Sequence, residues 1–429
     1  MNTLKLQSLL FISILISITE TKEPKIIEID LEFKEENNFF TVPITIGTGK
    51  KPQTFEVQLD TTTSETWVPS VNTTFDVQKY DQKKSKTSEI TDKTFEIDDE
   101  DGNVKGKATY DSLTVGENSL KKMGFVQVDE YELGFKDYNQ GKLGLGYKQE
   151  RGVDFNFIGN LKKNGIIDKA IFSILPEEQK LVIGGYPSDY EDESFTSCNI
   201  SETFDLDDAY RPGWVCELTH IFLGVNTDEK DLEMALQVDA RVIFDSGYKY
   251  ISMPRRHLKD FNEKFMQEFF NDSCIEVKEN HEIYFICDDD DKIESGNIAF
   301  VIGGYGYVVP YDKLFKRIED DKFELLIRFP RENDDIFSFG YPFLSQFAAV
   351  YDAEENRVSF YGGEKIDLTK DWDEYMLGET PLQKKEKMKK LLTYLGIFGA
   401  ILLLIIICIL IRSKHTTDSE ARAMINNEA

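Results

Sequence analysis

Two aspartates, each directly after an apolar run, are the residues of this 429-residue chain whose type and setting suit a chemical role. Asp60 follows the run Gln53–Leu59, and Asp245 follows Arg241–Phe244. Two carboxylates held a few ångströms apart cannot both ionise cheaply, so one of them keeps a proton. One carboxylate can then take a proton from water while the other gives a proton to a carbonyl oxygen. The pair predicts a hydrolysis that needs no metal, no cofactor and no covalent intermediate.

The residues beside both aspartates fit this role. Such a site needs hydroxyl groups that orient the acids, and Thr61, Thr63, Ser64 and Ser246 can supply them. It also needs small residues beside the acids, because the backbone must approach closely, and Gly247 meets that need in the second half.

The surrounding sequence predicts a mostly β protein. β-Branched and aromatic residues alternate with polar ones in the runs 39–46 and 53–59, which a Gly/Lys/Pro turn separates. Helical pattern is sparse, and it predicts helices only over 155–164, 255–270 and 311–318.

A weak internal duplication accompanies the two aspartates. Each is followed by a short apolar run and a proline, Trp67-Val68-Pro69 in one half and Ile251–Pro254 in the other. Later in each half comes an apolar–glycine turn, Leu143–Gly146 and Phe337–Gly340. Two similar halves, each with one carboxylate at a strand end, predict a cleft between two lobes.

The segment Asp60–Ser70 resembles the first-lobe motif of the pepsin-like aspartic peptidases, which is Asp-Thr-Gly-Ser-Ser followed by Trp-Val-Pro-Ser. Asp245-Ser246-Gly247 resembles their second-lobe motif, Asp-[Ser/Thr]-Gly. The resemblance extends from about Phe39 to Gly362. It includes four further segments, which are Leu143–Tyr147, Leu181–Gly185, Pro212–Trp214 and Phe339–Leu344.

The resemblance implies an all-β, bilobal fold with two six-stranded-type β lobes, over 39–190 and 191–366, and a central cleft. It implies that Asp60 and Asp245 are catalytic and that Thr63 and Ser246 orient them. Trp67 would support a hairpin flap over the cleft. The substrates would be extended peptides or proteins.

This chain departs from the family pattern at both aspartates. Thr62 stands where the family has a glycine whose backbone lies against the carboxylates, so we expect a shifted pair or backbone strain. Tyr248 stands where the family has a small hydroxyl residue.

The flap departs as well. The matching hairpin is Thr94–Tyr110, with its turn expected around Asp101, Gly102 and Asn103. The place of the family's flap tyrosine is held by Asp98 or Asp99, which would put acidic groups near the cleft.

Charge and composition narrow the partners. A formal net charge of −28 repels nucleic acid, so we exclude that class of partner. The acidic runs 98–101 and 288–291 lack the spacing of a calcium loop and indicate solvated loops. We expect a monomer.

Cysteines and sequons indicate an exported body. Four of the five cysteines form an even set that allows three pairings, and we favour the local pairs Cys198–Cys216 and Cys274–Cys287. The fifth, Cys408, lies in an apolar segment. Sequons at Asn72, Asn199 and Asn271 suit a glycoprotein.

Two apolar segments predict export and anchoring. Residues 1–20, with the short apolar core Leu9–Ile18, resemble a signal peptide, and 21–38 form a short N-terminal segment. Leu391–Ile411 is uncharged and long enough for a transmembrane helix, between a stalk over 367–390 and a cytoplasmic tail over 412–429. Lysines before this helix would favour the opposite orientation, but the signal peptide acts first. We expect a type I membrane protein of the secretory or endolysosomal pathway or the cell surface.

Two functions remain open. One is an active, membrane-tethered aspartic endopeptidase, which retention of both aspartates favours. The other is a catalytically impaired relative that binds peptide or protein in the same cleft, which Thr62, Tyr248 and the missing flap tyrosine favour.

Overall fold

The computed structural model describes residues 25–368 except for short internal segments. These segments are 35–37, 50–51, 75, 100–101, 132–139, 148–153, 189–194, 201–212, 227–230, 271–272, 280–281, 289–292, 294–295 and 331–335. The predicted signal peptide, transmembrane helix and tail lie outside the described residues, as does all but the first part of the predicted stalk. Within the described part of the chain, no helix is long and apolar enough to cross a membrane.

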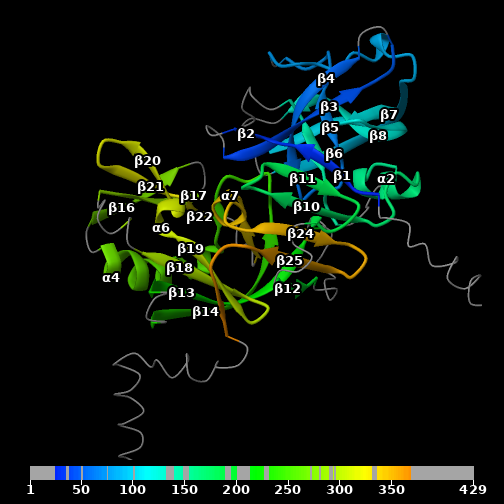
Figure 1. Cartoon of the computed structure of the whole chain (residues 1–429). Helices are drawn as coiled ribbons and strands as arrows, with labels where there is room; N and C mark the ends of the chain where they lie inside the picture. The colour runs from blue at the N-terminus through cyan, green and yellow to red at the C-terminus, as the bar shows by residue number, and fades with distance from the viewer. Residues whose placement is uncertain are drawn as a thin grey trace, which may run out of the picture. The chain divides into compact units, whose positions relative to one another are not determined.

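The first sheet carries Asp60 at the end of one of its central strands (Figure 1). Among the described residues it has eight strands, in the order β2 (Glu32–Lys34), β3 (Phe39–Ile46), β4 (Gln53–Asp60), β9 (Lys142–Gly144), β5 (Trp67–Pro69), β8 (Asn118–Tyr131), β7 (Gly102–Val115) and β6 (Glu89–Asp99).

The largest sheet carries Asp245, directly after strand β14. In the described residues it has twelve strands, in the order β20 (Phe315–Glu319), β21 (Lys322–Leu325), β17 (Glu282–Cys287), β22 (Ile327–Pro330), β15 (Ile251–Ser252), β23 (Ile336–Phe339), β14 (Asp231–Phe244), β13 (Val215–Asn226), β18 (Asn297–Ile302), β19 (Tyr305–Pro310) and β26 (Lys365–Asp367), with β16 (Cys274–Glu279) beside β17.

A third sheet joins strands from widely separated parts of the chain. Its six described strands are, in order, β1 (Ile27–Asp30), β11 (Lys180–Ile183), β10 (Ile171–Leu175), β24 (Ala348–Asp352), β25 (Arg357–Tyr361) and β12 (Thr196–Asn199). All residues of β10 and β24 are buried, so this sheet has core on both faces. The sheets that carry the two aspartates, expected to be of six-stranded type, instead have eight and twelve described strands, and the six-stranded sheet is this third one.

The two aspartates occupy equivalent places in the first two sheets. Strand β4 pairs in parallel with β9, which pairs antiparallel with β5. Strand β14 pairs in parallel with β23, which pairs antiparallel with β15. The next pairing is also parallel in both sheets, β5 with β8 and β15 with β22. The internal duplication predicted from the sequence is thus present in the strand topology.

The helices are short, and they confirm two of the three predictions. Helix α2 (Phe157–Lys163) begins after Asn156, whose side chain accepts a hydrogen bond from the Gly159 amide at 2.6 Å. The second predicted helix is a continuous series of turns, formed by η3 (Arg255–His257), α3 (Leu258–Phe261), η4 (Asn262–Met266) and α4 (Gln267–Phe270). The remaining short helices are η1 (Gln82–Lys84), α6 (Tyr311–Leu314) and α7 (Tyr341–Leu344).

The third predicted helix, over 311–318, is wrong beyond its first turn. Helix α6 ends at Leu314, because Phe315 begins strand β20 and pairs with Leu325 of β21. Phe315 is buried in this strand, whereas Ile318, the other apolar residue that suggested a longer helix, is 41% exposed.

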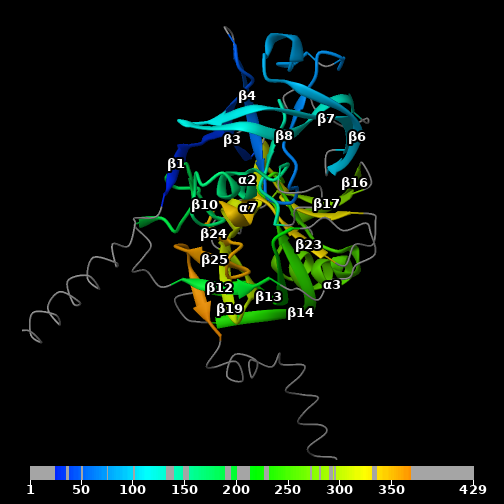
Figure 2. The ribbon, with the colours of Figure 1, turned by 90° about the vertical axis from the view of Figure 1, so that its right-hand side faces the viewer.

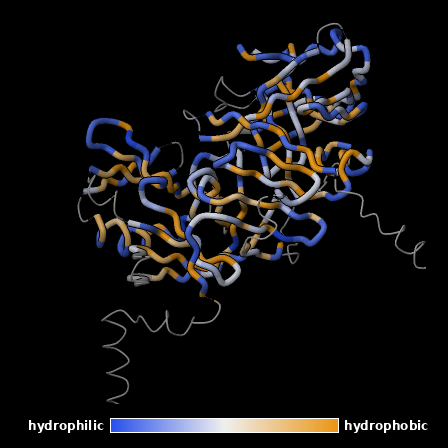
Figure 3. Tube along the Cα trace, viewed as in Figure 1, coloured by the Kyte–Doolittle hydropathy of each residue, from blue (hydrophilic) through white to orange (hydrophobic). Residues whose placement is uncertain are grey.

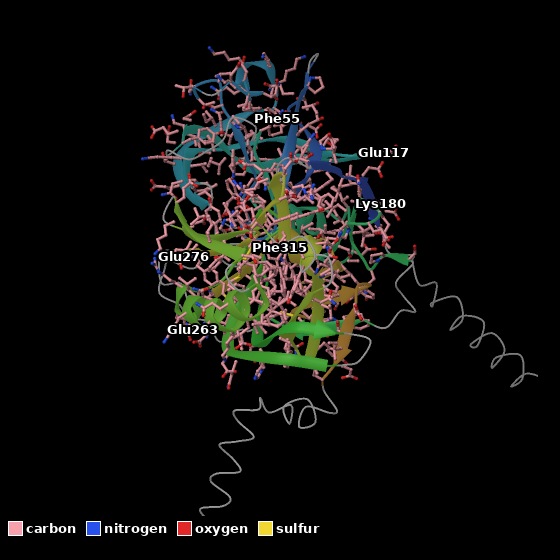
Figure 4. All side chains as sticks on the ribbon, turned by 90° about the vertical axis from the view of Figure 1, so that its left-hand side faces the viewer. Phe55, Glu117, Lys180, Glu263, Glu276 and Phe315 are labelled. Atoms are coloured by element: carbon pink, nitrogen blue, oxygen red, sulfur yellow. A yellow bond between two sulfur atoms is a disulfide. The ribbon has the colours of Figure 1, made fainter. Side chains whose placement is uncertain are left out.

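Hydrophobic residues, in orange, occur along the inner strands, and many of the outer turns are hydrophilic, in blue (Figure 3). Phe55 and Phe315 lie within the dense interior, whereas Glu117, Glu263 and Glu276 project from the surface (Figure 4). A large cluster of buried apolar residues includes strands of all three sheets. This packing fixes the strand ends at which the two aspartates lie.

Candidate active site

Asp60 and Asp245 are both buried, with 1% and 3% of their surface exposed. Each lies at the end of a strand in a different sheet. Asp60 is the last residue of β4, and Asp245 directly follows β14. The amide of Asp245 donates to Phe339 O of β23 at 2.9 Å. The parallel neighbour of each strand therefore supports the position of its aspartate.

Hydroxyl groups tie the two strand ends to one another. The Thr61 hydroxyl donates to Phe244 O at 2.6 Å and accepts from the Ser246 amide at 3.0 Å. The Ser246 hydroxyl in turn donates to Leu59 O at 2.9 Å. Each residue that follows an aspartate thus bonds the backbone that precedes or follows the other aspartate. These reciprocal bonds bring the two predicted catalytic residues together.

Backbone amides orient one oxygen of each carboxylate. Asp60 Oδ1 accepts from the amides of Thr62 at 2.8 Å and Thr63 at 3.0 Å. Asp245 Oδ1 accepts from the Gly247 amide at 2.9 Å. The Thr63 hydroxyl, predicted to orient the acid, makes no hydrogen bond to any described residue, and Thr63 contacts Asp60 through its amide instead.

Thr62 fits its position without backbone strain. It is not among the described non-glycine residues with a positive φ, so the expected strain is absent. Its hydroxyl adds a bond of 2.6 Å to Asp60 Oδ1, which a glycine cannot make. The departure from the family motif therefore strengthens the hold on Asp60.

Two glycines let a neighbouring strand pass closely beneath each aspartate loop. A Cβ atom on Gly144 would lie 2.5 Å from the backbone carbon of Ser64. A Cβ atom on Gly340, the equivalent glycine in the other half, would lie 2.1 Å from Tyr248 O. The apolar–glycine turns found in the sequence are thus explained by close backbone approach. The Tyr248 carbonyl also accepts from the Tyr341 amide at 2.8 Å.

Trp67 lies beneath the hairpin formed by β6 and β7, which Figure 2 shows beside β8. It is fully buried in an apolar cluster with Phe95 and Ile97 of β6 and Val104 of β7. Tyr131, at the end of β8, packs edge-on against Trp67 with ring centroids 5.9 Å apart. Sequence analysis missed Tyr131, because it lies well outside the expected hairpin.

The hairpin predicted over Thr94–Tyr110 is present, but its strands extend further than expected. Asp98 pairs with Asn103 and Asp99 with Gly102. Gly102 and Asn103 are therefore strand residues and not part of the turn. Asp101 lies outside the described residues, and the side chain of Asp99 is likewise not described.

Lys142 is the functional candidate that sequence analysis did not identify. Its ammonium lies 3.2 Å from Asp60 Oδ2, and the exposed fractions of the two side chains are 4% and 1%. Lys142 is the first residue of β9 and pairs with Gln58 of β4. In the sequence, Lys142 directly precedes the apolar–glycine turn Leu143–Gly146, but that position does not say that the lysine contacts Asp60.

The cysteines and two of the three sequons agree with an exported body. Disulfides join Cys198 to Cys216 and Cys274 to Cys287, as favoured from the sequence. Asn72 and Asn199 are exposed. Asn271 lies outside the described residues.

Comparison with known proteins identifies the class. The model of the eukaryotic aspartyl protease family matches residues 39–361, and the chain belongs to this family. It is 29% identical to plasmepsin IV of Plasmodium falciparum (isolate 3D7) over 334 residues, which cover 73% of this chain and 67% of the relative. It is 23% identical to embryonic pepsinogen of Gallus gallus over 355 residues, 80% of this chain and 83% of the relative. It is 25% identical to vacuolar protease A of Neurospora crassa over 329 residues, 73% and 76% of the two chains. The chain is thus a pepsin-like aspartic peptidase by family.

Proposed function

We propose that this protein is an aspartic-type endopeptidase that hydrolyses peptide bonds with a water molecule activated between Asp60 and Asp245. The observation that carries the proposal is the reciprocal bonding of Thr61 and Ser246, which holds two buried carboxylates at equivalent strand ends. Family membership supports the same reaction. The substrate would be an extended peptide or protein segment in a cleft between lobes over 39–190 and 191–366.

The chemistry follows from one shared proton. The ionised carboxylate takes a proton from water as the water oxygen attacks the peptide carbonyl carbon. The protonated carboxyl gives its proton to the carbonyl oxygen, which produces a neutral tetrahedral intermediate. The C–N bond then breaks as a proton returns to the amine, and both products leave. The amides of Thr62 and Gly247 hold the carboxylates in place throughout.

We place the enzyme body on the lumenal or extracellular side of a secretory-pathway membrane. The two disulfides and the exposed sequon residues Asn72 and Asn199 support an oxidising, exported setting. The apolar segment Leu391–Ile411 would anchor it as a type I protein. A monomer remains our expectation for its assembly.

A binding protein with little or no catalysis is the second candidate. The contact of Lys142 with Asp60 favours it, because a cation beside one carboxylate opposes the proton sharing that hydrolysis needs. Such a protein would hold an extended peptide in the same cleft without cleaving it.

Peptide cleavage by the full-length protein in detergent distinguishes the two functions. We expect cleavage of an extended peptide at some pH between about 3 and 7, inhibited by pepstatin and lost in Asp245→Asn. The substitution keeps the size of the side chain but removes its ability to ionise. Folded protein that cleaves no peptide across this range would favour the binding function.

A further inference from the structure

Lys142 lies at the centre of the proposed site, and neither the family motifs nor the proposed mechanism gives it a role. Its ammonium is 3.2 Å from Asp60 Oδ2, on the opposite oxygen from the one held by the amides of Thr62 and Thr63. Both side chains of the pair are almost completely buried. A buried lysine is costly unless it is paired, so this contact is a built feature of the site.

The ammonium also adjoins the second half of the site. An atom placed at the Cβ position of Gly247 would lie 3.5 Å from Lys142 Nζ and 3.2 Å from Asp245 Oδ1. The same point is 3.5 Å from Gln58 Nε2, which donates to Gly247 O at 2.6 Å. Lys142 is therefore paired with Asp60 of the first half and lies close to Gly247, which follows Asp245 in the second half.

The other ionisable residues buried in the segments that form or adjoin the site are acids and a tyrosine. Asp60 on β4, Asp245 after β14 and the buried Glu65 between β4 and β5 are acidic. Burial raises the pKa of the Tyr351 hydroxyl on β24 well above its usual range, and the charge of Asp245 raises it further, so Tyr351 stays neutral. Among these buried acids, Asp60 is the one whose ion pair with Lys142 the structure describes.

Two strand neighbours of Lys142 are uncharged. Gln58 is its partner in the parallel pairing with β4, and Trp67 is its partner in the antiparallel pairing with β5. Both are buried. The residues that pair with Lys142 on β4 and β5 therefore place no charged side chain directly opposite it.

We propose that Lys142 is a positioning residue that holds Asp60 in its ionised form and thereby confines proton sharing by the two aspartates to acidic pH. The proposal rests on the proposed endopeptidase function. A nearby positive charge stabilises the state in which both carboxylates are ionised. The state with one shared proton, which hydrolysis requires, is then reached only at lower pH. The enzyme would be inactive at neutral pH and become active on acidification.

The test compares pH profiles of the full-length protein with those of three Lys142 variants. Lys142→Met and Lys142→Gln both remove the charge, and the glutamine variant keeps a polar group should methionine prevent folding. Lys142→Arg keeps the charge and is the rescue variant. Lys163→Met, which removes an exposed lysine paired with Asp154, is the matched control. Thermal unfolding establishes that each variant is folded.

Two quantities are measured from about pH 3 to 8, the kcat/KM for peptide cleavage and the Kd of pepstatin. Pepstatin is a peptide inhibitor whose hydroxyl binds between the two carboxylates, so its binding reports on the shared proton without requiring turnover. We expect the alkaline limb of both profiles to move up by about 1–3 pH units in Lys142→Met and Lys142→Gln. Lys142→Arg and Lys163→Met should keep the limb of the unsubstituted protein.

The possible outcomes distinguish a failure of the role proposed for Lys142 from a failure of the proposed endopeptidase function. A limb that stays in place in both uncharged variants overturns the role of Lys142, even if cleavage is robust. A shifted limb for pepstatin binding without any cleavage supports Lys142 and overturns the endopeptidase. Folded protein and variants that neither cleave peptide nor bind pepstatin at any pH overturn both.

Discussion

At the scale of single residues, Thr61 is the side chain on which the geometry of the site depends most. Its hydroxyl donates a hydrogen bond to Phe244 O and accepts one from the Ser246 amide, and all three groups are buried. Removing this hydroxyl leaves a carbonyl and an amide without their partner in the protein interior, which is more costly than losing an exposed bond.

We expect Thr61→Val to lower the free energy of unfolding by about 1–3 kcal/mol. The kcat/KM should fall at least about tenfold, because the carboxylates are no longer held in register. Denaturant unfolding and peptide cleavage measure the two effects. The matched control is Thr45→Val, which removes an exposed hydroxyl bonded to Thr54. Equal effects of the two substitutions would contradict the role assigned to Thr61.

The sequence motifs identified the residues that the structure brings together at the two strand ends, because these residues follow one another along the chain. Asp60, Asp245, Thr61 and Ser246 each adjoin a recognisable strand end. Lys142 became visible only through the pairing of β9 with β4, because the sequence does not state which strand a lysine will face. The backbone strain expected at Thr62 is absent, because strain depends on a φ angle that the residue type does not fix.

At the scale of elements, the packing of β9 against the loop after β4 sets a tight steric limit in the first half of the site. Gly144 leaves no room for a side chain, since its Cβ would meet the backbone of Ser64 and Glu65 at 2.5–2.7 Å. This contact is with backbone atoms, which cannot rotate away as a flexible side chain could.

Gly144→Ala should therefore push the loop after Asp60 away from β9. We expect a loss of about 1–3 kcal/mol in the free energy of unfolding, together with a lower kcat/KM. Gly306→Ala is the matched control, because its Cβ would make only ordinary contacts, the nearest at 3.6 Å from Ile366 and Leu368. That variant should be unchanged or up to about 1 kcal/mol more stable. Urea unfolding measures the free energy of unfolding of both variants. A Gly144→Ala protein as stable as the unsubstituted protein would contradict the steric account.

Element types were predictable where local pattern and tertiary pairing agree. The alternating run that became β3 and the capped helix α2 are examples. Helix α6 was predicted too long, because the short run after Leu314, in which only Phe315 is buried, pairs with β21 as a strand, and so short a pattern does not distinguish a strand from a helix. The flap hairpin was placed correctly, but its turn was not, since register depends on the partner strand.

At the scale of the whole molecule, the duplicated strand topology accounts for a site made from two halves. Each half delivers one aspartate at the end of a strand, beside a parallel neighbour and a close-packed glycine. The sequence could predict this duplication from the two motifs. It could not predict how the third sheet would join β1, β10 and β24, because those contacts link segments far apart in the chain.

The central claim is that Asp60 and Asp245 act as one catalytic unit. The most direct measurement is kcat/KM for peptide cleavage at the optimal pH by Asp60→Asn, Asp245→Asn and the double variant, each verified as folded. Groups that act as a unit are strongly non-additive, so each single substitution should abolish cleavage about as completely as both together. Substantial cleavage by either single variant would contradict the account. So would a double variant whose fold-loss in kcat/KM equals the product of two modest fold-losses in the single variants.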